Sequence, residues 1–137
     1  MALHFGHYLL ILFLMLFLHI VDDYYLQGVL AKMKQKKWWE ENASDSLYED
    51  DYIIALFIHA FSWSFMITLP WFVIAFISTN TLLIVFLILS YFCNVIVHTL
   101  TDHMKANEHK LSLVQDQGRH FYQIIITWVI LTLVYII

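Results

Sequence analysis

Long apolar stretches alternate with shorter polar ones along the whole chain. An α-helix rises about 1.5 Å per residue, so about 20 apolar residues are needed to cross the hydrocarbon core of a bilayer. Four stretches are long enough and predict membrane-spanning helices at about residues 3–21, 52–77, 81–100 and 121–137. Together they predict an all-α fold, a four-transmembrane-helix bundle, in a single integral membrane domain covering residues 1–137.

The polar connections between these stretches differ in length. Residues 78–81 leave room only for a tight turn, whereas residues 27–51 and 103–119 form long connections. Within the first of these, Gly28–Trp39 alternates apolar residues with lysines and ends in two tryptophans. This pattern predicts an interfacial amphipathic helix on the inner leaflet, and a solvated basic loop anchored by two tryptophans explains it equally well.

The basic residues are confined to these two connections and their edges. They are Lys32, Lys34, Lys36, Lys37, Lys105, Lys110 and Arg119. Loops rich in lysine and arginine stay on the cytoplasmic side of a membrane. We therefore expect both long connections in the cytoplasm and both termini outside.

The composition agrees with a membrane protein, since 61% of the residues are hydrophobic and only 13% are charged. A water-soluble domain of 137 residues could not bury so many apolar side chains. The composition excludes a disordered tail, and no nucleic acid is expected as a partner because the net charge is −4. The expected partner is the lipid bilayer. A single cysteine excludes a disulfide framework.

Histidines and aspartates recur near the cytoplasmic ends of the expected spans. Three pairs are spaced four residues apart, which places both members on one helix face, and a further histidine lies about two turns into the second span. Because the spans alternate in direction, all of these residues fall at one depth. We expect seven side chains to converge in one pocket: His19, Asp23, His59, His98, Asp102, Asp116 and His120. Asp22, about 100° around the helix from Asp23, is expected to face elsewhere.

Imidazole and carboxylate groups together are ligands for a divalent transition ion such as zinc, iron or manganese. Seven of them exceed the needs of one tetrahedral site. Either some aspartates orient the imidazoles, or two ions share a bridging carboxylate. A proton- or ion-conducting cluster and simple helix–helix adhesion are alternative interpretations of the same residues.

Several short motifs occur in one order along nearly the whole chain. The first is His19-x-x-x-Asp23-Tyr-Tyr-Leu26-Gln27, and a lysine near Lys34 or Lys36 follows it. The others are the single His59, then His98-x-x-x-Asp102 with Lys105, and Asp116-Gln117-x-x-His120. This order resembles a family of small membrane proteins of bacteria and their phages, described only as a domain of unknown function. The acidic insertion Glu40–Asp51 and the second acid Asp22 depart from that pattern.

The resemblance implies a bacterial cytoplasmic (inner) membrane and allows a phage-encoded protein, but it implies no activity. From the residues, the first hypothesis is a metal-dependent hydrolase acting at the inner membrane surface. Asp23, Asp102 and Asp116 are the candidate catalytic residues, since an acid that does not bind the metal can move protons. The candidate substrate-binding residues are Gln27, Lys105, Gln117 and Arg119. We expect the cations Lys105, Lys110 and Arg119 to flank the pocket and to favour an anionic substrate, such as a phosphorylated small molecule or a lipid headgroup.

Two other classes of function remain open. The cluster could belong to a carrier of cations, protons or small solutes, although four spans are few for alternating access unless the protein forms a homo-oligomer. Alternatively, the protein could be a non-enzymatic phage or bacterial membrane protein that modulates a partner complex and needs no metal.

Overall fold

The computed structural model describes residues 4–137, and within this range it contains helices and no strand. The four long helices are α1 (Phe5–Ile20), α4 (Asp51–Ser78), α5 (Thr81–Ala106) and α6 (Leu113–Ile136). A π-helical segment, η1 (Val21–Leu26), continues α1 directly. With η1 included, all four are long and apolar enough to cross a membrane. The predicted all-α bundle is thus confirmed.

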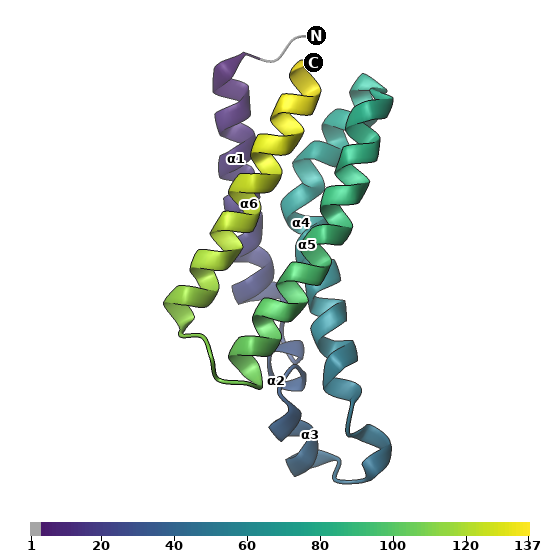
Figure 1. The fold of residues 1–137 in the computed structure, drawn as a ribbon, viewed down its shortest axis with the longest axis vertical. Coiled ribbons are helices and arrows are strands. Elements are labelled where there is room, and N and C mark those ends of the chain that lie inside the picture. Colours follow the sequence, from purple (N-terminus) through teal and green to yellow (C-terminus); the bar gives the residue numbers. More distant parts are fainter. Residues whose placement is uncertain (1–3) are drawn as a thin grey trace.

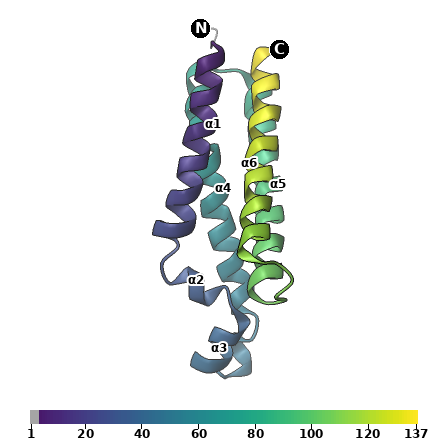
Figure 2. The ribbon, with the colours of Figure 1, turned by 90° about the vertical axis from the view of Figure 1, so that its left-hand side faces the viewer.

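The helices form a closed bundle in which α4 packs against α1 and α5, and α6 packs against α5 and α1 (Figures 1 and 2). Both chain ends and the α4–α5 turn lie at one end of the bundle, which we call the terminal end. The short helices and the α5–α6 connection lie at the other, which we call the loop end. An even number of spans produces this arrangement.

Two helices are longer than the apolar pattern predicts. Helix α5 continues to Ala106 instead of ending near residue 100, and α6 begins at Leu113 instead of near residue 121. The additional turns carry polar residues that are buried between helices, so hydropathy alone does not detect them. Ser112 and Gln115 begin α6 with a capping box.

The tight turn between the second and third spans is present as predicted. Thr79 adopts a left-handed conformation with φ of 51° and ends α4. The Asn80 side chain then accepts a hydrogen bond of 3.1 Å from the backbone N–H of Leu83 and begins α5. These two devices make α4 and α5 adjacent antiparallel helices.

The first long connection is helical, but in two short pieces instead of one. Helix α2 (Leu30–Met33) and helix α3 (Lys36–Asn42) are separated at Lys34, and a short 3₁₀ turn, η2 (Ser46–Tyr48), leads into α4. Asn107 holds this break from the end of α5. Its amide donates to the carbonyl of Lys34 at 3.0 Å, and its oxygen accepts from the N–H of Lys36 at 2.7 Å.

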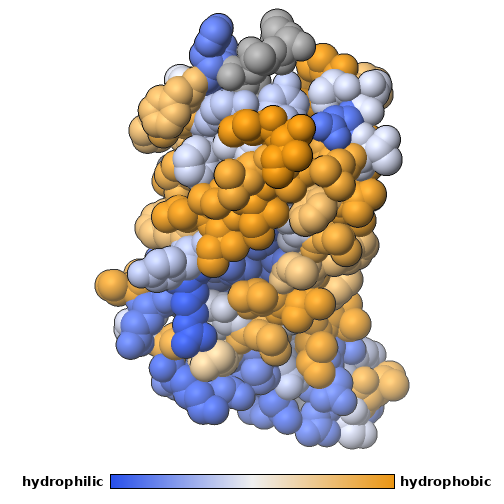
Figure 3. All heavy atoms as spheres, turned by 45° about the horizontal axis from the view of Figure 1, so that its top comes forward, coloured by the Kyte–Doolittle hydropathy of each residue, from blue (hydrophilic) through white to orange (hydrophobic). Residues whose placement is uncertain are grey.

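The two halves of the bundle differ in what they bury. The terminal half has an apolar core that includes Met15, Ile67, Trp71, Leu87 and Leu131, each at most 1% exposed. The loop half buries the ionisable residues. Outward-facing side chains are largely apolar, and the hydrophilic residues gather over the loop end (Figure 3). An apolar outer surface around a partly polar interior fits a lipid environment.

Candidate metal centre

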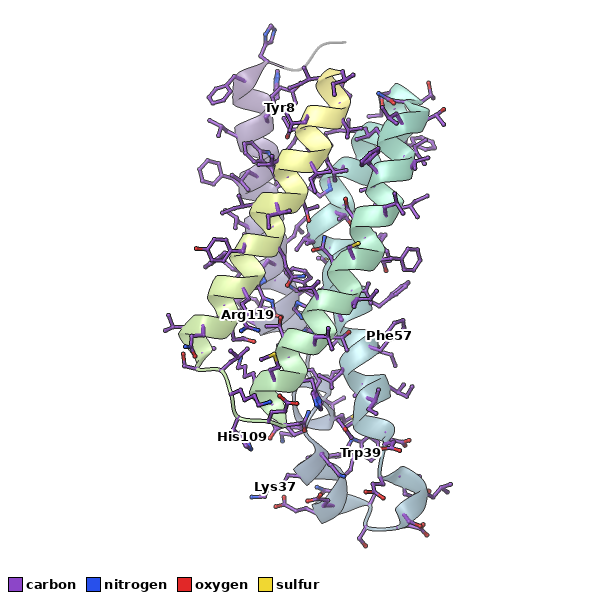
Figure 4. The ribbon with its side chains drawn as sticks, in the orientation of Figure 1. Tyr8, Lys37, Trp39, Phe57, His109 and Arg119 are labelled. Carbon is purple, nitrogen blue, oxygen red and sulfur yellow. The ribbon has the colours of Figure 1, made fainter. Side chains whose placement is uncertain are left out.

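The structure brings the seven histidines and aspartates together inside the loop half of the bundle. Each is at most 8% exposed, although they come from all four spans, with η1 counted as part of the first. Helix α1 and η1 supply His19 and Asp23, α4 supplies His59, and α5 and α6 supply the remaining four. The cluster therefore depends on packing of the whole bundle. Tyr8 lies far from it, toward the terminal end, whereas Lys37 and His109 lie at the loop end (Figure 4).

Asp102 lies at the middle of the cluster and faces imidazoles on both of its oxygens. Its Oδ1 is 3.4 Å from Nε2 of His120 and 3.7 Å from Nε2 of His98. Its Oδ2 is 3.5 Å from Nε2 of His59. On either side, Asp23 Oδ1 is 3.1 Å from His59 Nε2, and Asp116 Oδ1 is 3.5 Å from His120 Nε2.

These spacings suit coordination of a cation. In a tetrahedral site with bonds of about 2.0–2.1 Å, neighbouring ligand atoms lie about 3.3–3.4 Å apart. Two triads have ligand atoms within 4.8 Å of one another: Asp23 with His59 and His98, and His98 with Asp102 and His120. All members of both triads are buried.

Several buried atoms of the cluster lack a hydrogen-bond partner within residues 4–137. They are Asp22 Oδ2, His59 Nε2, His98 Nδ1 and Nε2, Asp116 Oδ1 and His120 Nε2. Buried polar atoms are nearly always satisfied, because leaving one unpaired costs about 1–3 kcal/mol. His59 Nε2 lies close to a carboxylate yet is not oriented for a hydrogen bond to it. Such atoms require another partner, and a metal ion fits imidazole nitrogens that face carboxylates.

His19 is used differently from the other histidines. The Trp63 indole N–H donates to its Nδ1 at 2.8 Å, so its Nε2 carries the proton and donates to Gln117 Oε1 at 3.1 Å. The Gln117 amide then donates to Asp23 and Asp116, at 3.3 and 3.2 Å. Both nitrogens of His19 are engaged, so it positions the carboxylates of Asp23 and Asp116 through Gln117 and leaves no atom for an ion.

His98 is held between two rings instead. It stacks on Trp63 and on His120, with 4.2 Å between ring centroids in each case and interplanar angles of 26° and 25°. Stacking fixes the plane of His98 without occupying its nitrogens. Both nitrogens therefore stay available in the plane of the ring, where a metal ion binds.

The expectation that Asp22 faces elsewhere is wrong. Asp22 is 1% exposed, its Oδ2 is 3.6 Å from Nδ1 of His59, and it accepts a hydrogen bond of 2.7 Å from Ser62. The cause is η1, in which the Gln27 N–H bonds to the carbonyl of Asp22, five residues back. This wide turn lets Asp22 and Asp23 face the bundle interior together. Asp22 thus adds a fourth carboxylate to the cluster, close to Nδ1 of His59 and on the side opposite Asp23.

Two lysines neutralise part of the charge of the cluster. Lys34 Nζ is 2.5 Å from Asp102 Oδ2, and Lys105 Nζ is 2.6 Å from Asp116 Oδ2. Four carboxylates, on Asp22, Asp23, Asp102 and Asp116, stand against these two ammonium groups. The pocket therefore keeps a formal charge of −2 when its imidazoles are neutral.

Of the four residues expected to bind substrate, three line a common cavity and one does not. Lys105, Gln117 and Gln27 line a small cavity of about 70 Å³ that also contains Asp23, Asp102 and Asp116. Gln27 donates its amide to the backbone carbonyl of Asp23.

Arg119 and Lys110 lie away from this cavity, and the expectation that they flank it is wrong. Arg119 is exposed on α6 (Figure 4) and contacts the sulfur of Met104 at 3.4 Å. Lys110 is 2.9 Å from Glu108, and this hydrogen bond lowers the pKa of that carboxyl group. Both residues are solvated cations of the loop end.

The small cavity is continuous in its lining with a larger cleft of about 430 Å³ at the loop end. Gln27, Lys34, Asp102 and Lys105 line both. The larger cleft adds Gln35 and His109, among others. The cluster can thus be reached from the loop end, through an opening bordered by two ammonium groups.

Some residues of the site carry no motif that sequence analysis can isolate. Trp63 looks like any aromatic residue of a membrane span, and Ser62 like a minor polar residue. Lys34 belongs to a run of lysines. The order of motifs that resembles the bacterial and phage family was the one signal that indicated Lys34 or Lys36. Gln123 joins the cluster at 3.4 Å from His120 Nδ1 and bonds onward to Asn94.

The arrangement offers a buried set of imidazole and carboxylate ligands, residues that orient them, and a cationic opening toward the loop end. These groups could hold a metal ion. Comparisons of the chain with protein-family models, with curated proteins and with solved structures find no match.

Proposed function

We propose that the cluster binds one divalent transition ion and that the protein is a metal-dependent hydrolase of an anionic substrate. One observation carries this proposal: the Nε2 atoms of His59, His98 and His120 face carboxylates at 3.1–3.7 Å without hydrogen bonds. Helix packing alone would favour satisfied side chains at these positions.

His98, Asp102 and His120 are the favoured ligands. Asp102 Oδ2 is engaged by Lys34, which leaves Oδ1 toward the two imidazoles. Three protein ligands with an open position are typical of catalytic sites. The charge of the pocket supports a single ion, because one divalent cation neutralises the formal −2, whereas two would leave an equal positive excess.

The other residues then have separate roles. A divalent ion held by this triad would lower the pKa of a bound water and polarise a phosphoryl or carbonyl oxygen. Asp23, beside His59, accepts the proton of the attacking water. Asp116 holds Lys105 in place, and Gln123 holds His120 through its Nδ1. Lys34 and Lys105 bind the anionic oxygens of the substrate at the opening.

We place this opening on the cytoplasmic side of a bacterial inner membrane. All seven basic residues lie in the loop-end connections or at their edges. The order of the motifs resembles that of the bacterial and phage family, and this resemblance supports a bacterial inner membrane. The genes that surround the coding sequence would test a phage origin.

Elemental analysis of the detergent-purified protein tests the metal directly. We expect about one equivalent of zinc, iron or manganese, and we expect its loss in His98→Ala and in His120→Ala. His109→Ala is the matched control, because His109 is exposed in the α5–α6 connection. A folded protein without metal, or full metal content in both cluster variants, would contradict the proposal.

A second candidate function, a cation or proton carrier, is favoured by one observation. Gln123 bonds to Asn94, and Asn94 donates to Thr127 at 2.8 Å, so polar groups continue from His120 toward the terminal end. Farther along, Trp71 and Leu131 are 0% exposed in an apolar core. Cation flux into proteoliposomes, without hydrolysis of phosphorylated compounds, would select the carrier.

A further inference from the structure

A groove runs between α5 and α6 on the surface that faces lipid. It has a volume of about 360 Å³, and apolar side chains, including Leu89, Ile126 and Ile130, form its walls. Buried polar side chains also line it, namely Asn94 and Gln123, at 5% and 8% exposure. Asn94 and Gln123 bond to each other across α5 and α6, so a polar contact between the two helices lies beneath the apolar walls of the groove.

The groove follows the same helix pair as the metal cluster. Gln123 lines it and lies 3.4 Å from Nδ1 of His120. Toward the loop end, the contact between α5 and α6 continues to the ion pair of Lys105 with Asp116. Lys105 follows Asn94 by eleven residues, which is about 16 Å along a helix. One seam therefore joins an apolar groove, the cluster and a cationic opening.

We propose that the substrate is an anionic membrane lipid, with an acyl chain in the α5–α6 groove and its headgroup at Lys105 and Lys34. This inference rests on the proposed function and names its substrate class. Along the seam, the apolar groove is followed by the charged opening toward the loop end. A lipid in one leaflet has the same order, with its acyl chain followed by its headgroup. A soluble phosphate ester would use the opening but not the groove. The lipid enters sideways from the bilayer, so its headgroup reaches the ion without leaving the interface.

Photo-crosslinking tests the groove. The protein is placed in phosphatidylcholine vesicles that contain phosphatidylglycerol with a diazirine in its acyl chain, and crosslinked residues are mapped by mass spectrometry. We expect labelling to concentrate on residues 86–97 and 123–130. Ile126→Trp, which fills the groove, should reduce this labelling about five- to tenfold. Ile125→Trp is the matched control, because Ile125 is 44% exposed on the same helix but does not line the groove.

The headgroup is tested in the same vesicles with Lys105→Met, and with Lys110→Met as the control cation. Lys105→Met should remove the preference for phosphatidylglycerol over an equally labelled phosphatidylcholine, and Lys110→Met should keep it. Uniform labelling of all lipid-facing helices, or labelling that Ile126→Trp leaves unchanged, would overturn the proposal. If glycerol phosphate competes with the lipid for labelling equally well in the unmodified protein and in Ile126→Trp, that result would also overturn the proposal, in favour of a soluble ester as substrate.

Metal content of each variant separates this inference from the proposed function. Ile126→Trp should keep its metal while losing lipid labelling, and His98→Ala should lose its metal while keeping lipid in the groove. Metal binding without groove labelling overturns the lipid substrate alone. Absence of metal in the unmodified protein overturns the hydrolase.

Discussion

His19 and His98 show how differently two buried imidazoles of one cluster are used. Both are 0% exposed, but among the described residues 4–137 His19 has hydrogen bonds on both nitrogens and His98 has them on neither. Trp63 contacts both residues, since its N–H bonds to His19 and its ring stacks on His98. Trp63 therefore positions the carboxylates of Asp23 and Asp116 through His19, and it fixes the ring plane of the candidate ligand His98 directly.

Replacing Trp63 by phenylalanine separates these contributions. Trp63→Phe keeps an aromatic ring for His98 but removes the donor to His19, so the Gln117 relay to the carboxylates loosens. We expect metal affinity to fall about 10- to 100-fold, as for other residues that orient ligands. Competition with a chelator of known affinity measures it. Trp71→Phe is the control, because the Trp71 N–H has no hydrogen-bond partner within residues 4–137; an equal loss there would refute the relay.

Lys34 forms a buried ion pair with Asp102. Lys34→Met leaves Asp102 Oδ2 without its cation, and breaking a buried ion pair costs about 3–5 kcal/mol. We expect the metal-free variant to have a lower Tm than the unmodified protein. Added divalent metal should raise the Tm of the variant by more than it raises the Tm of the unmodified protein, because the pocket is more negative without the Lys34 ammonium group.

The control for this prediction is Lys36→Met. Lys36 pairs with Glu49 at 3.1 Å on the surface of the first connection, and this hydrogen bond raises the pKa of the lysine. Its removal should change Tm little. Equal effects of the two substitutions would show that Lys34 acts as an ordinary surface charge.

Two elements of irregular geometry bring residues to the cluster. The π-helical segment η1 turns Asp22 inward, and the break between α2 and α3 lets Lys34 reach Asp102. Both depend on contacts with distant segments. The amphipathic pattern of Gly28–Trp39 predicts helix but contains no signal for the break, which is made by Asn107, 73 residues away from Lys34.

Asn107→Ala tests this dependence. Without its two hydrogen bonds, the segment of residues 30–42 should open more often, and its amide hydrogen exchange should become about fivefold faster or more, since a hydrogen bond contributes about 1 kcal/mol. Mass spectrometry of deuterium uptake measures the change. Asn42→Ala is the control, because the Asn42 side chain donates within α3, to the carbonyl of Trp38. Faster exchange throughout α5 instead would contradict the local clamp.

At the scale of the whole molecule, both termini and the α4–α5 turn lie at the terminal end, opposite all basic connections (Figure 1). Cys93 is the only cysteine, so a Cys93→Ser background permits labelling at chosen positions. We expect Ser78→Cys to react with an impermeant maleimide on intact spheroplasts. Ser44→Cys should react only after permeabilisation. The reverse pattern would place the cluster's opening outside the cell.

The fold and much of the cluster were predictable from the sequence. Apolar length predicts spans, and spacing of four residues predicts a shared face for His98 with Asp102 and for Asp116 with His120. The spacing of residues along the chain does not reveal which imidazole nitrogens form hydrogen bonds, so the role of His19 could be recognised only from the three-dimensional structure. An inference from spacing also assumes regular α-helices. The π-helical segment η1 departs from that geometry, so the inward position of Asp22 could not be predicted.

The two uncompensated negative charges of the pocket have a consequence for the cell. A dication and a pair of protons are alternative ways to reach electrical neutrality inside the bundle, so they compete for the same carboxylates and imidazoles. If the proposed ion binds, we expect loading to expel protons, and we expect acidification on the side of the opening to release the ion. Occupancy would follow the local supply of trace elements and the acidity of the compartment at the same time.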